Sequence, residues 1–345
     1  MSIDLTSIAG KNRLLFEIPL RPIQGQRFQP TGFPNLGAAT FKSAQGDCLL
    51  VESAQSMANR LEMTIWDSAK NDVIEAVKGI SHVRVERKSK DGSKAFLTDS
   101  IIEAHRLNSP YLLEGSNKQF FNTLKQELGT MDEGIPDRKK LSEVLLKYDV
   151  GSLLHGVFLA KKELAGGRLR IARALSAFVE ATGVQVAASG GVKNDAVNPS
   201  GDTKKGFGNI PFSRDEYTAK EITLYVNLDL AQIRGYGFDD TVSNLLIVLA
   251  LYKIGKLVHG DMRFRTACDL EIDASKMKKI SASNIPEFVL PELSEMEIDL
   301  KDSIAKLKEK MPGATVEYND KLEKKSDKDN VSKESAGEES DEVPA

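Results

Sequence analysis

Apolar residues dominate positions 13–20 (RLLFEIPL), and this short run beside prolines predicts a mostly buried strand. Glycines and prolines then recur over 25–46, which is typical of a loop. Over 51–67 apolar residues return at three- and four-residue spacing, which predicts an amphipathic helix. The loop is basic, with Arg21, Arg27 and Lys42, and helix N-termini attract anions, so the segment is a candidate phosphate site. An ordinary surface loop before an ordinary helix is the alternative.

The same patterns predict the remaining elements. The predicted strands are 82–87, 151–160, 221–234 and 262–271, and residues 168–182 fit a strand that turns into a helix. The predicted helices are 99–111, 120–128, 139–147, 242–258 and about 293–311. Residues 242–258 are apolar nearly all round, so this helix should be the most buried, with Thr241 as its N-cap and Gly260 at its end.

A second glycine- and proline-rich stretch spans 187–214. A structureless segment of this length inside a compact domain is uncommon, and it is usually functional or disordered. This one carries several polar donors, namely Lys193, Asn194, Lys204 and Lys205. The stretch is therefore a second candidate binding segment.

Strand–helix–strand units mixed with hairpin signals predict an α+β fold rather than a doubly wound parallel sheet. Within that class we expect a ferredoxin-like core, with the helical segments of about 99–147 inserted between its strands.

Charge is distributed unevenly along the chain. The formal net charge is −3, but residues 319–345 hold five lysines and nine acidic residues, so the body is close to neutral. A nucleic-acid-binding surface on such a body must be local. The tail has almost no apolar residues and is expected to be disordered.

The two cysteines, Cys48 and Cys268, lie far apart and are expected to be reduced thiols. The N-terminus lacks the pattern of a signal peptide, and the longest apolar run, 245–252, is short of the ~20 residues that span a bilayer. We therefore expect a cytoplasmic protein without membrane association.

Signatures of catalysis are mostly absent, since the chain has no P-loop, HExxH, GxSxG or clustered Cys/His motif. His155 lies in an apolar segment and is expected to be a satisfied core residue. We expect neither a metal site nor a cofactor. Residues 205–212 (KGFGNIPF) resemble the RNA-reading strand of an RRM, but Asn209 replaces a stacking aromatic, so a loop or hairpin arm is the better interpretation.

Three arginines, Arg168, Arg170 and Arg173, form the strongest local basic signal. Alternate positions on a strand share a face, so Arg168 and Arg170 would suit contact with a phosphate backbone. A solvated surface is the alternative interpretation.

Longer blocks carry a more specific signal. They are RFQPTGFPNLGAA (27–39), VESAQSMANRLE (51–62), SLLHGVF (152–158), RALSAFVEA (173–181), SGGVKNDAVNPSG (189–201), GFGNIPF (206–212), LDLAQIRGYG (228–237) and RFRTACDLE (263–271). Together, and in this order, they resemble the backbone RAMP subunit (Cas-seven family) of the CRISPR type I-U, or I-G, Cascade complex.

The resemblance implies a single domain, 1–318, shaped like a hand. An RRM-like palm would take 13–98, 151–186 and 219–275, a helical finger insertion about 99–150, a β-hairpin thumb about 187–218, and a C-terminal helix about 293–311. Such subunits polymerise head to tail along the CRISPR RNA and leave the guide open to pair with target DNA. The implied partners are CRISPR RNA, target DNA through the guide, copies of the same chain and other Cascade subunits. Base pairing would supply specificity while the protein reads the backbone.

We therefore predict a non-catalytic RNA-binding protein. The expected guide contacts are Arg21, Arg27, Lys42, Ser53, Gln55, Ser56 and Asn59, followed by Arg168, Arg170, Arg173, Lys193, Asn194, Lys204 and Lys205. The main alternative is a RAMP-type endoribonuclease that uses Asp47, the aspartate before the first helix. A small-molecule enzyme built on the glycine-rich loops is a third possibility.

Overall fold

A computed structural model describes residues 3–33, 37–44, 46–88, 92–115, 118–129, 135–260 and 262–320. Apart from Asn319 and Asp320, the acidic tail lies outside the described residues. The described residues combine helices and strands, and the predicted α+β class is confirmed.

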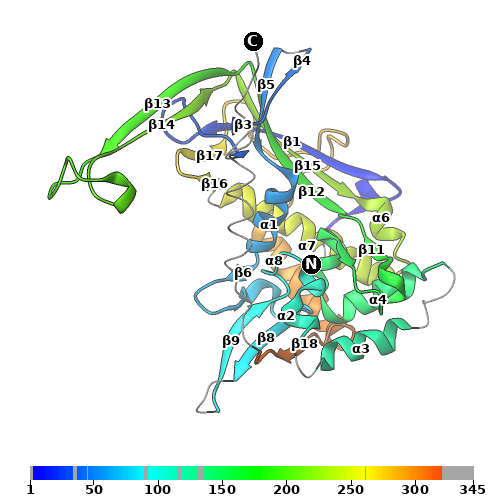
Figure 1. Cartoon of the computed structure of the whole chain (residues 1–345). Helices are drawn as coiled ribbons and strands as arrows, with labels where there is room; N and C mark the ends of the chain where they lie inside the picture. Colours follow the sequence, from blue (N-terminus) through cyan, green and yellow to red (C-terminus); the bar gives the residue numbers. More distant parts are fainter. Residues whose placement is uncertain are drawn as a thin grey trace, which may run out of the picture.

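A curled antiparallel sheet forms the upper part of the molecule (Figure 1). Within the described residues it has seven strands, in the order β16–β17–β1–β15–β12–β5–β4. They are β16 (Met262–Arg265), β17 (Cys268–Ile272), β1 (Arg13–Pro22), β15 (Glu221–Asp229), β12 (Leu175–Thr182), β5 (Gly46–Glu52) and β4 (Thr40–Ser43). Alternate residues of β1, beginning with Leu14 and Phe16, are buried, so one face of the sheet covers the core.

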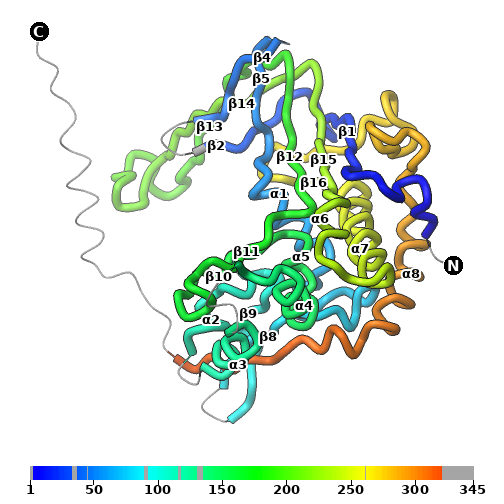
Figure 2. The backbone as a smooth tube through the Cα atoms, turned by 90° about the vertical axis from the view of Figure 1, so that its right-hand side faces the viewer, coloured from blue at the N-terminus to red at the C-terminus, as the bar shows by residue number. Residues whose placement is uncertain are grey.

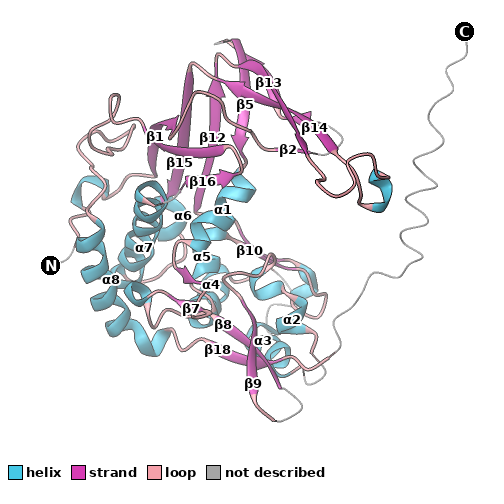
Figure 3. Cartoon of the chain, turned by 90° about the vertical axis from the view of Figure 1, so that its left-hand side faces the viewer, coloured by secondary structure: helices cyan, strands magenta, loops and turns pink. Residues whose placement is uncertain are grey.

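Helices gather below this sheet (Figure 3). They are α1 (Ala54–Met63), α2 (Pro110–Leu113), α3 (Gln119–Leu128), α4 (Arg138–Tyr148), α5 (Gly151–His155), α6 (Leu230–Arg234), α7 (Asp240–His259) and α8 (Leu293–Leu307). As predicted, α7 is buried nearly all round and ends at Gly260. Its N-cap is Asp239 rather than Thr241, because the Asp239 carboxylate accepts a hydrogen bond from the Val242 N–H. Helix α7 is long and apolar enough to cross a membrane, but 83% of its most apolar window is buried in the fold, as expected of a core helix.

A smaller sheet lies at the lower end of the molecule, beside α2 and α3 (Figures 1 and 2). It joins β8 (Val83–Lys88), β9 (Lys94–Asp99) and β18 (Ala314–Glu317), in the order β18–β8–β9. The resemblance implies that residues 83–98 belong to the palm, but β8 and β9 do not pair with the main sheet. The unpredicted strand β18 pairs in parallel with β8 and so returns the end of the described chain to this region.

The most prominent projection is a long β-hairpin of β13 (Gln185–Lys193) and β14 (Ile210–Thr218), which extends away from the body (Figure 1). Nine residue pairs, from Gln185↔Thr218 to Lys193↔Ile210, join the two strands. The expected β-hairpin is therefore present. The stretch 187–214 is irregular only over 194–209, because its two ends belong to β13 and β14. Shorter strand pairs are β2 (Gly32–Phe33) with β3 (Gly37–Ala38), β6 (Trp66–Asp67) with β7 (Asp72–Val73), and β10 (Val157–Leu159) with β11 (Leu169–Ile171).

The first predicted helix begins later than expected. Residues 46–52 form β5, which pairs with β12, and the helix starts only after Ser53. The apolar run Leu49, Leu50 and Val51 suits a helix face and a buried strand equally well, so periodicity alone did not decide. The preceding loop is also more ordered than predicted, because it contains β2, β3 and β4.

Three other predictions were wrong in part. The single helix expected over 99–111 is replaced by turns, a short 3-10 helix (Arg106–Asn108) and the start of α2. Residues 151–155 form α5 before the short strand β10, and residues 175–182 continue as a strand. In each segment, contacts with distant elements outweigh local preference; β12, for example, is paired on both sides, with β15 and with β5.

The smaller sheet contains a pH-sensitive pair. His82 Nδ1 lies 2.6 Å from Oδ2 of the buried Asp99. Burial opposes the charged imidazole, but the hydrogen bond and charge of Asp99, helped by Asp149 and Asp72, outweigh it and raise the pKa of His82 above 6.5. A raised histidine pKa stabilises the fold fully below the unfolded-state pKa, and the contribution is lost as pH rises through the folded-state pKa.

The stability advantage of the wild type over His82→Gln should therefore be larger at pH 5.5 than at pH 8.5, as measured by urea denaturation. Burial raises the pKa of Asp149 to about 6, so Asp149 titrates in the same range in both proteins, and the difference between them includes its attraction to the charged His82. An advantage that is constant or grows with pH would contradict this assignment.

Candidate RNA interface

The two glycine-rich segments, far apart in the sequence, meet in the structure. Phe28 and Tyr217 exchange both of their backbone hydrogen bonds, each 2.9 Å long, and so join the first loop to the root of the hairpin. The Gln29 N–H also donates to the Ala267 carbonyl oxygen, 2.7 Å away, at the β16–β17 turn. Figure 2 shows β2 beside β13 and β14. The two candidate binding segments are therefore neighbours in the structure.

A hollow of about 450 Å³ lies where these segments meet. One wall comes from residues 29–32 and 37–38 of the first loop, and the other from Arg214, Asp215, Tyr217 and Arg265. Arg214 is held by Glu216, with 2.6 Å between Nη2 and Oε1. The hollow thus offers backbone groups and arginine edges, which are common contacts for a phosphate–sugar backbone.

The three predicted cations of the first loop are all accessible. Side chains of Arg21 and Arg27 are each 56% exposed and that of Lys42 is 89% exposed. Each has one acidic neighbour: Glu271 lies 2.7 Å from Arg21, Glu216 3.7 Å from Arg27, and Asp47 3.7 Å from Lys42. Exposed ion pairs such as those of Arg21 and Lys42 contribute about 0–1 kcal/mol, so a phosphate competes for these two cations at little cost. The partner of Arg27, Glu216, is buried.

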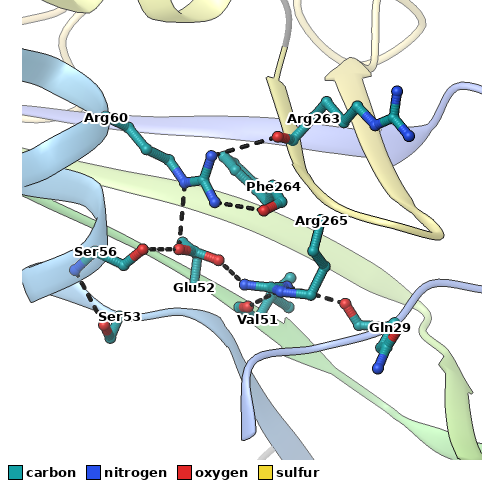
Figure 4. Close-up of polar contacts among 9 residues, drawn as sticks. All are labelled: Gln29, Val51, Glu52, Ser53, Ser56, Arg60, Arg263, Phe264 and Arg265. Atoms are coloured by element: carbon teal, nitrogen blue, oxygen red, sulfur yellow. Dashed lines mark hydrogen bonds and ion pairs between the residues drawn. The ribbon is translucent and has the colours of Figure 1, made fainter. Parts of the chain in front are cut away.

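The start of α1 is built around the carboxylate of Glu52, which is 1% exposed (Figure 4). Arg60 lies 3.2 Å from Glu52 Oε1, while Arg265 pairs with Oε2. Arg265 also donates to the carbonyl oxygens of Gln29 and Val51, at 3.0 and 3.1 Å. Through these ion pairs and hydrogen bonds, the Glu52–Arg60–Arg265 cluster connects β5, α1, β16 and the first loop.

The four predicted contacts on α1 divide into two groups. Ser53 is the N-cap and accepts from the Ser56 N–H, and the Ser56 hydroxyl donates to Glu52. These two serines therefore already have structural partners. Gln55 and Asn59 are exposed and are available to a ligand.

The tip of the hairpin is ordered by Asp195. Its carboxylate accepts from the N–H groups of Val197, Asn198 and Gly208, at 2.9, 3.0 and 2.8 Å, and these backbone hydrogen bonds lower its pKa. Gly208 is required there, because φ is +81° and a Cβ would collide with the Gly201 carbonyl oxygen.

The hairpin presents cations and aromatic rings together. The predicted contacts Lys193, Asn194, Lys204 and Lys205 are all exposed, and so are Phe207 and Phe212. Neither phenylalanine was among the predicted contacts, although both lie in the GFGNIPF block. Aromatic faces beside lysines are typical of surfaces that stack bases and hold a single-stranded backbone.

Arg168 and Arg170 are both exposed and flank the buried Leu169, as residues on one face of a strand do. Arg168 precedes β11 and its Nε donates to the Ala165 carbonyl oxygen, at 3.0 Å. Arg170 is exposed on β11, and Arg173 donates to the Ala54 carbonyl oxygen, at 3.4 Å, at the start of α1. Arg170 and Arg173 line a separate large cavity.

Gly156 allows the backbone to pass close to β11 beside this cavity. Its φ is +79°, and a Cβ would lie 2.9 Å from the Ile171 carbonyl oxygen, so only glycine lets this backbone approach β11 closely. The close approach brings His155 to the cavity that Arg170 and Arg173 line.

Sequence reasoning missed the other arginines of that cavity, Arg13, Arg106 and Arg138. They come from three separate parts of the chain, and no local motif connects them. It also missed the roles of Arg60 and Arg265, for which the only sequence signal was positive charge near the first and last strands.

Asp47 of the endoribonuclease alternative lies on β5, with its side chain 66% exposed beside Lys42. In the part of the chain that the structure describes, no group of three His, Cys, Asp or Glu side chains is placed to hold a metal ion.

These features define an α+β protein in which a basic loop and a protruding hairpin meet beside the first helix. The family model for CRISPR-associated protein GSU0053 matches residues 14–186, just over half of the chain. The chain belongs to this CRISPR-associated family. No curated protein matches it.

Three solved structures are distantly similar. One chain of a "CRISPR RNA-guided surveillance complex, pre-nicking" shares 13% identity, with 90% of this chain and 95% of that chain covered and a TM-score of 0.35. Csc2 of Thermofilum pendens shares 8%, with 89% and 82% covered and a TM-score of 0.32. A chain of a second "CRISPR RNA-guided surveillance complex" shares 13%, with 70% and 71% covered and a TM-score of 0.26. TM-scores this low do not establish a shared fold, so the family assignment rests on the sequence match.

Proposed function

We propose that this protein is a non-catalytic backbone subunit of a Cascade-type CRISPR surveillance complex of type I-U/I-G. Copies of the chain bind a CRISPR RNA head to tail in the cytoplasm, join other Cascade subunits and leave the guide free to pair with target DNA. Membership of a CRISPR-associated family and the eight sequence blocks support this proposal.

The observation that carries the proposal is the contact between the first loop and the hairpin root through Phe28 and Tyr217. It gathers exposed cations, main-chain groups and the N-terminal turn of α1 on one side of the molecule, although the body as a whole is close to neutral. A local basic surface of this kind positions a nucleic-acid backbone without reading its bases.

The strand order supports a ferredoxin-like palm. The succession β1, α1, β12, β15, α7, β17 is a β-α-β-β-α-β unit, and its strands occupy the middle of the sheet in the order β17–β1–β15–β12. In this proposal the β13–β14 hairpin is the thumb, and the region with α2, α3 and α4 is the finger.

The hairpin also explains how copies could associate. It exposes Val186, Val192 and Ile210 in addition to its two phenylalanines. Apolar side chains gathered on a projecting arm are typical of an interaction surface rather than of an isolated monomer. We assign this arm to contact with guide RNA and the adjacent copy.

The direct test neutralises the first loop. Changing Arg21, Arg27 and Lys42 together to alanine should weaken guide-RNA binding equally for unrelated guide sequences. It should also flatten the slope of log affinity against log salt by about 2, since each lost contact to a single strand contributes about 0.7. Filter binding at several salt concentrations gives both quantities.

The matched control also removes three positive charges. It changes the exposed residues Lys301, Lys306 and Lys308, on and beside α8, to alanine. This variant should keep the wild-type affinity and slope. Equal behaviour of the two triple variants would refute the assignment of the first loop.

The endoribonuclease alternative is tested with labelled repeat RNA and target RNA, with and without Mg²⁺. Discrete products that disappear in Asp47→Ala would favour that alternative over a non-catalytic role.

A further inference from the structure

A second, larger cavity lies at the end of the main sheet opposite the hairpin. Its volume is about 1070 Å³, and its walls come from the start of β1, the segment 104–108, β10, β11 and α6. The hairpin leaves the sheet at Thr182, whereas this cavity is at the end where Arg13 pairs with Asp229. A volume of this order accommodates a ligand the size of a nucleotide.

The cavity is strongly basic. Arg13 and Arg106 are neutralised, Arg13 by Asp229 and Arg106 by Glu62, at 2.6 and 2.7 Å. Arg138, Arg170 and Arg173 also line the cavity, and none forms an ion pair with any described residue. Among the described residues, Asp229 is the only acid in the lining. Three uncompensated guanidinium groups favour an anionic ligand, and guanidinium suits phosphate in particular.

A buried hydrogen-bond donor in the lining lacks a partner. His155 is 1% exposed, and its Nε2 lies 2.8 Å from Nζ of the buried Lys253. Burial lowers the pKa of Lys253 to about 8, so at pH 7 it is mainly an ammonium group, which can only donate. Nε2 therefore accepts, and the ring proton of the neutral imidazole is on Nδ1.

Within the described residues Nδ1 has no hydrogen-bond partner. Lys253 does not line the cavity, whereas His155 does. An unpaired buried donor costs about 1–3 kcal/mol and calls for an explanation, and an acceptor in the cavity supplies one. Arg106 and Arg173 are close enough to depress the pKa of His155, after burial and Lys253, so this is also where the cationic groups converge.

The open side of the cavity carries an exposed aromatic ring. Phe158 on β10 is 52% exposed and lies directly opposite Arg170 of β11. A base that stacks on such a ring gains about 1–3 kcal/mol. The cavity therefore combines a stacking surface with a basic wall that contains a buried donor.

We propose that this cavity binds a single nucleotide, with a phosphate oxygen accepting from His155 Nδ1–H and from Arg170 and Arg173, and with the base stacked on Phe158. The nucleotide is either one unit of a bound single strand or a free mononucleotide. The inference rests on the proposed function only if the nucleotide is one unit of a bound single strand. Arg173 touches the start of α1 through the Ala54 carbonyl oxygen, so a strand that follows the guide interface passes close to the cavity.

Three variants test the site, and two of them change exposed residues that should not affect folding. Phe158→Leu removes the ring but keeps an apolar side chain, and Arg170→Ala removes one unpaired guanidinium. His155→Met keeps a weak acceptor for Lys253, the thioether sulfur, and has no hydrogen-bond donor. Lys301→Ala on α8 is the control. Thermal unfolding of each variant checks that the fold is intact.

Two kinds of titration distinguish a free mononucleotide from one unit of a bound single strand. Adenosine 5′-monophosphate, adenosine and inorganic phosphate are titrated by calorimetry, and single-stranded RNA with one 2-aminopurine is followed by fluorescence. Calorimetric binding of the monophosphate, at least tenfold tighter than adenosine, indicates a free nucleotide as ligand. A fluorescence change with RNA alone indicates a strand unit. In either case each of the three variants should weaken the signal at least fivefold, and Lys301→Ala should not.

The proposal is overturned if neither probe gives a signal that depends on Phe158, Arg170 and His155. Guide binding by the Arg21, Arg27 and Lys42 variant is measured in parallel. If guide binding responds to that variant while neither probe responds to the cavity variants, this inference fails alone and the proposed function stands. If guide RNA does not bind at all but the monophosphate binds in a variant-dependent way, the proposed function fails and the nucleotide site stands.

Discussion

Replacing Glu52 with alanine is expected to lower the free energy of unfolding by about 3–5 kcal/mol, because it leaves two partly buried arginines without their shared partner. Arg60 and Arg265 both pair with the Glu52 carboxylate, and burial already lowers the pKa of each guanidinium group. The cluster joins four separate segments, so its loss is not confined to α1. Urea denaturation followed by circular dichroism measures the change.

Glu271→Ala is the matched control, because Glu271 pairs with one arginine, Arg21, on the surface, with side chains 42% and 56% exposed. An exposed pair contributes about 0–1 kcal/mol, so this variant should remain close to the wild type. If Glu52→Ala and Glu271→Ala were equally stable, the Glu52–Arg60–Arg265 cluster would not have the structural role assigned to it.

Shortening the hairpin should have the largest effect on function. Replacing residues 194–209 with Asn-Gly removes Lys204, Lys205 and Phe207 while the strands β13 and β14 keep their pairing. We expect guide-RNA affinity to fall at least tenfold, because one stacked base alone contributes about 1–3 kcal/mol. Assembly with RNA should be lost as well. Filter binding and size-exclusion chromatography measure the two effects.

The body should be unaffected by this change, because within the described residues the hydrogen bonds of 194–209 stay inside the hairpin. An unchanged melting temperature therefore serves as the internal control. A shortened protein that binds guide RNA and assembles like the wild type would show that the hairpin is not a thumb.

The sequence predicted elements whose pattern is set locally. Strand β1 alternates between buried and exposed positions, and α7 is apolar nearly all round, so their own residues decide their structure. Strand β12 was misjudged, although its buried residues Leu175, Ala177, Val179 and Ala181 alternate as those of a strand do. The period of two was present, but helix-favouring alanines and a phenylalanine obscured it.

The candidate site was predictable only where charge and glycine cluster along the chain. The first loop and the hairpin satisfied that condition. Pairings across the fold could not be predicted: Glu52 and Arg265 lie 213 positions apart, and Arg106 reaches Glu62 from a segment that was expected to be a helix. Long-range ion pairs leave no periodic signal in a single sequence.

The most direct measurement is the mass and RNA content of the protein purified after co-expression with a CRISPR repeat–spacer array. A backbone subunit should elute as a particle of several copies that holds short RNA of uniform length, detected by light scattering and denaturing gels. An RNA-free monomer under the same conditions would contradict the account, since the loop and hairpin would then have no strand to hold.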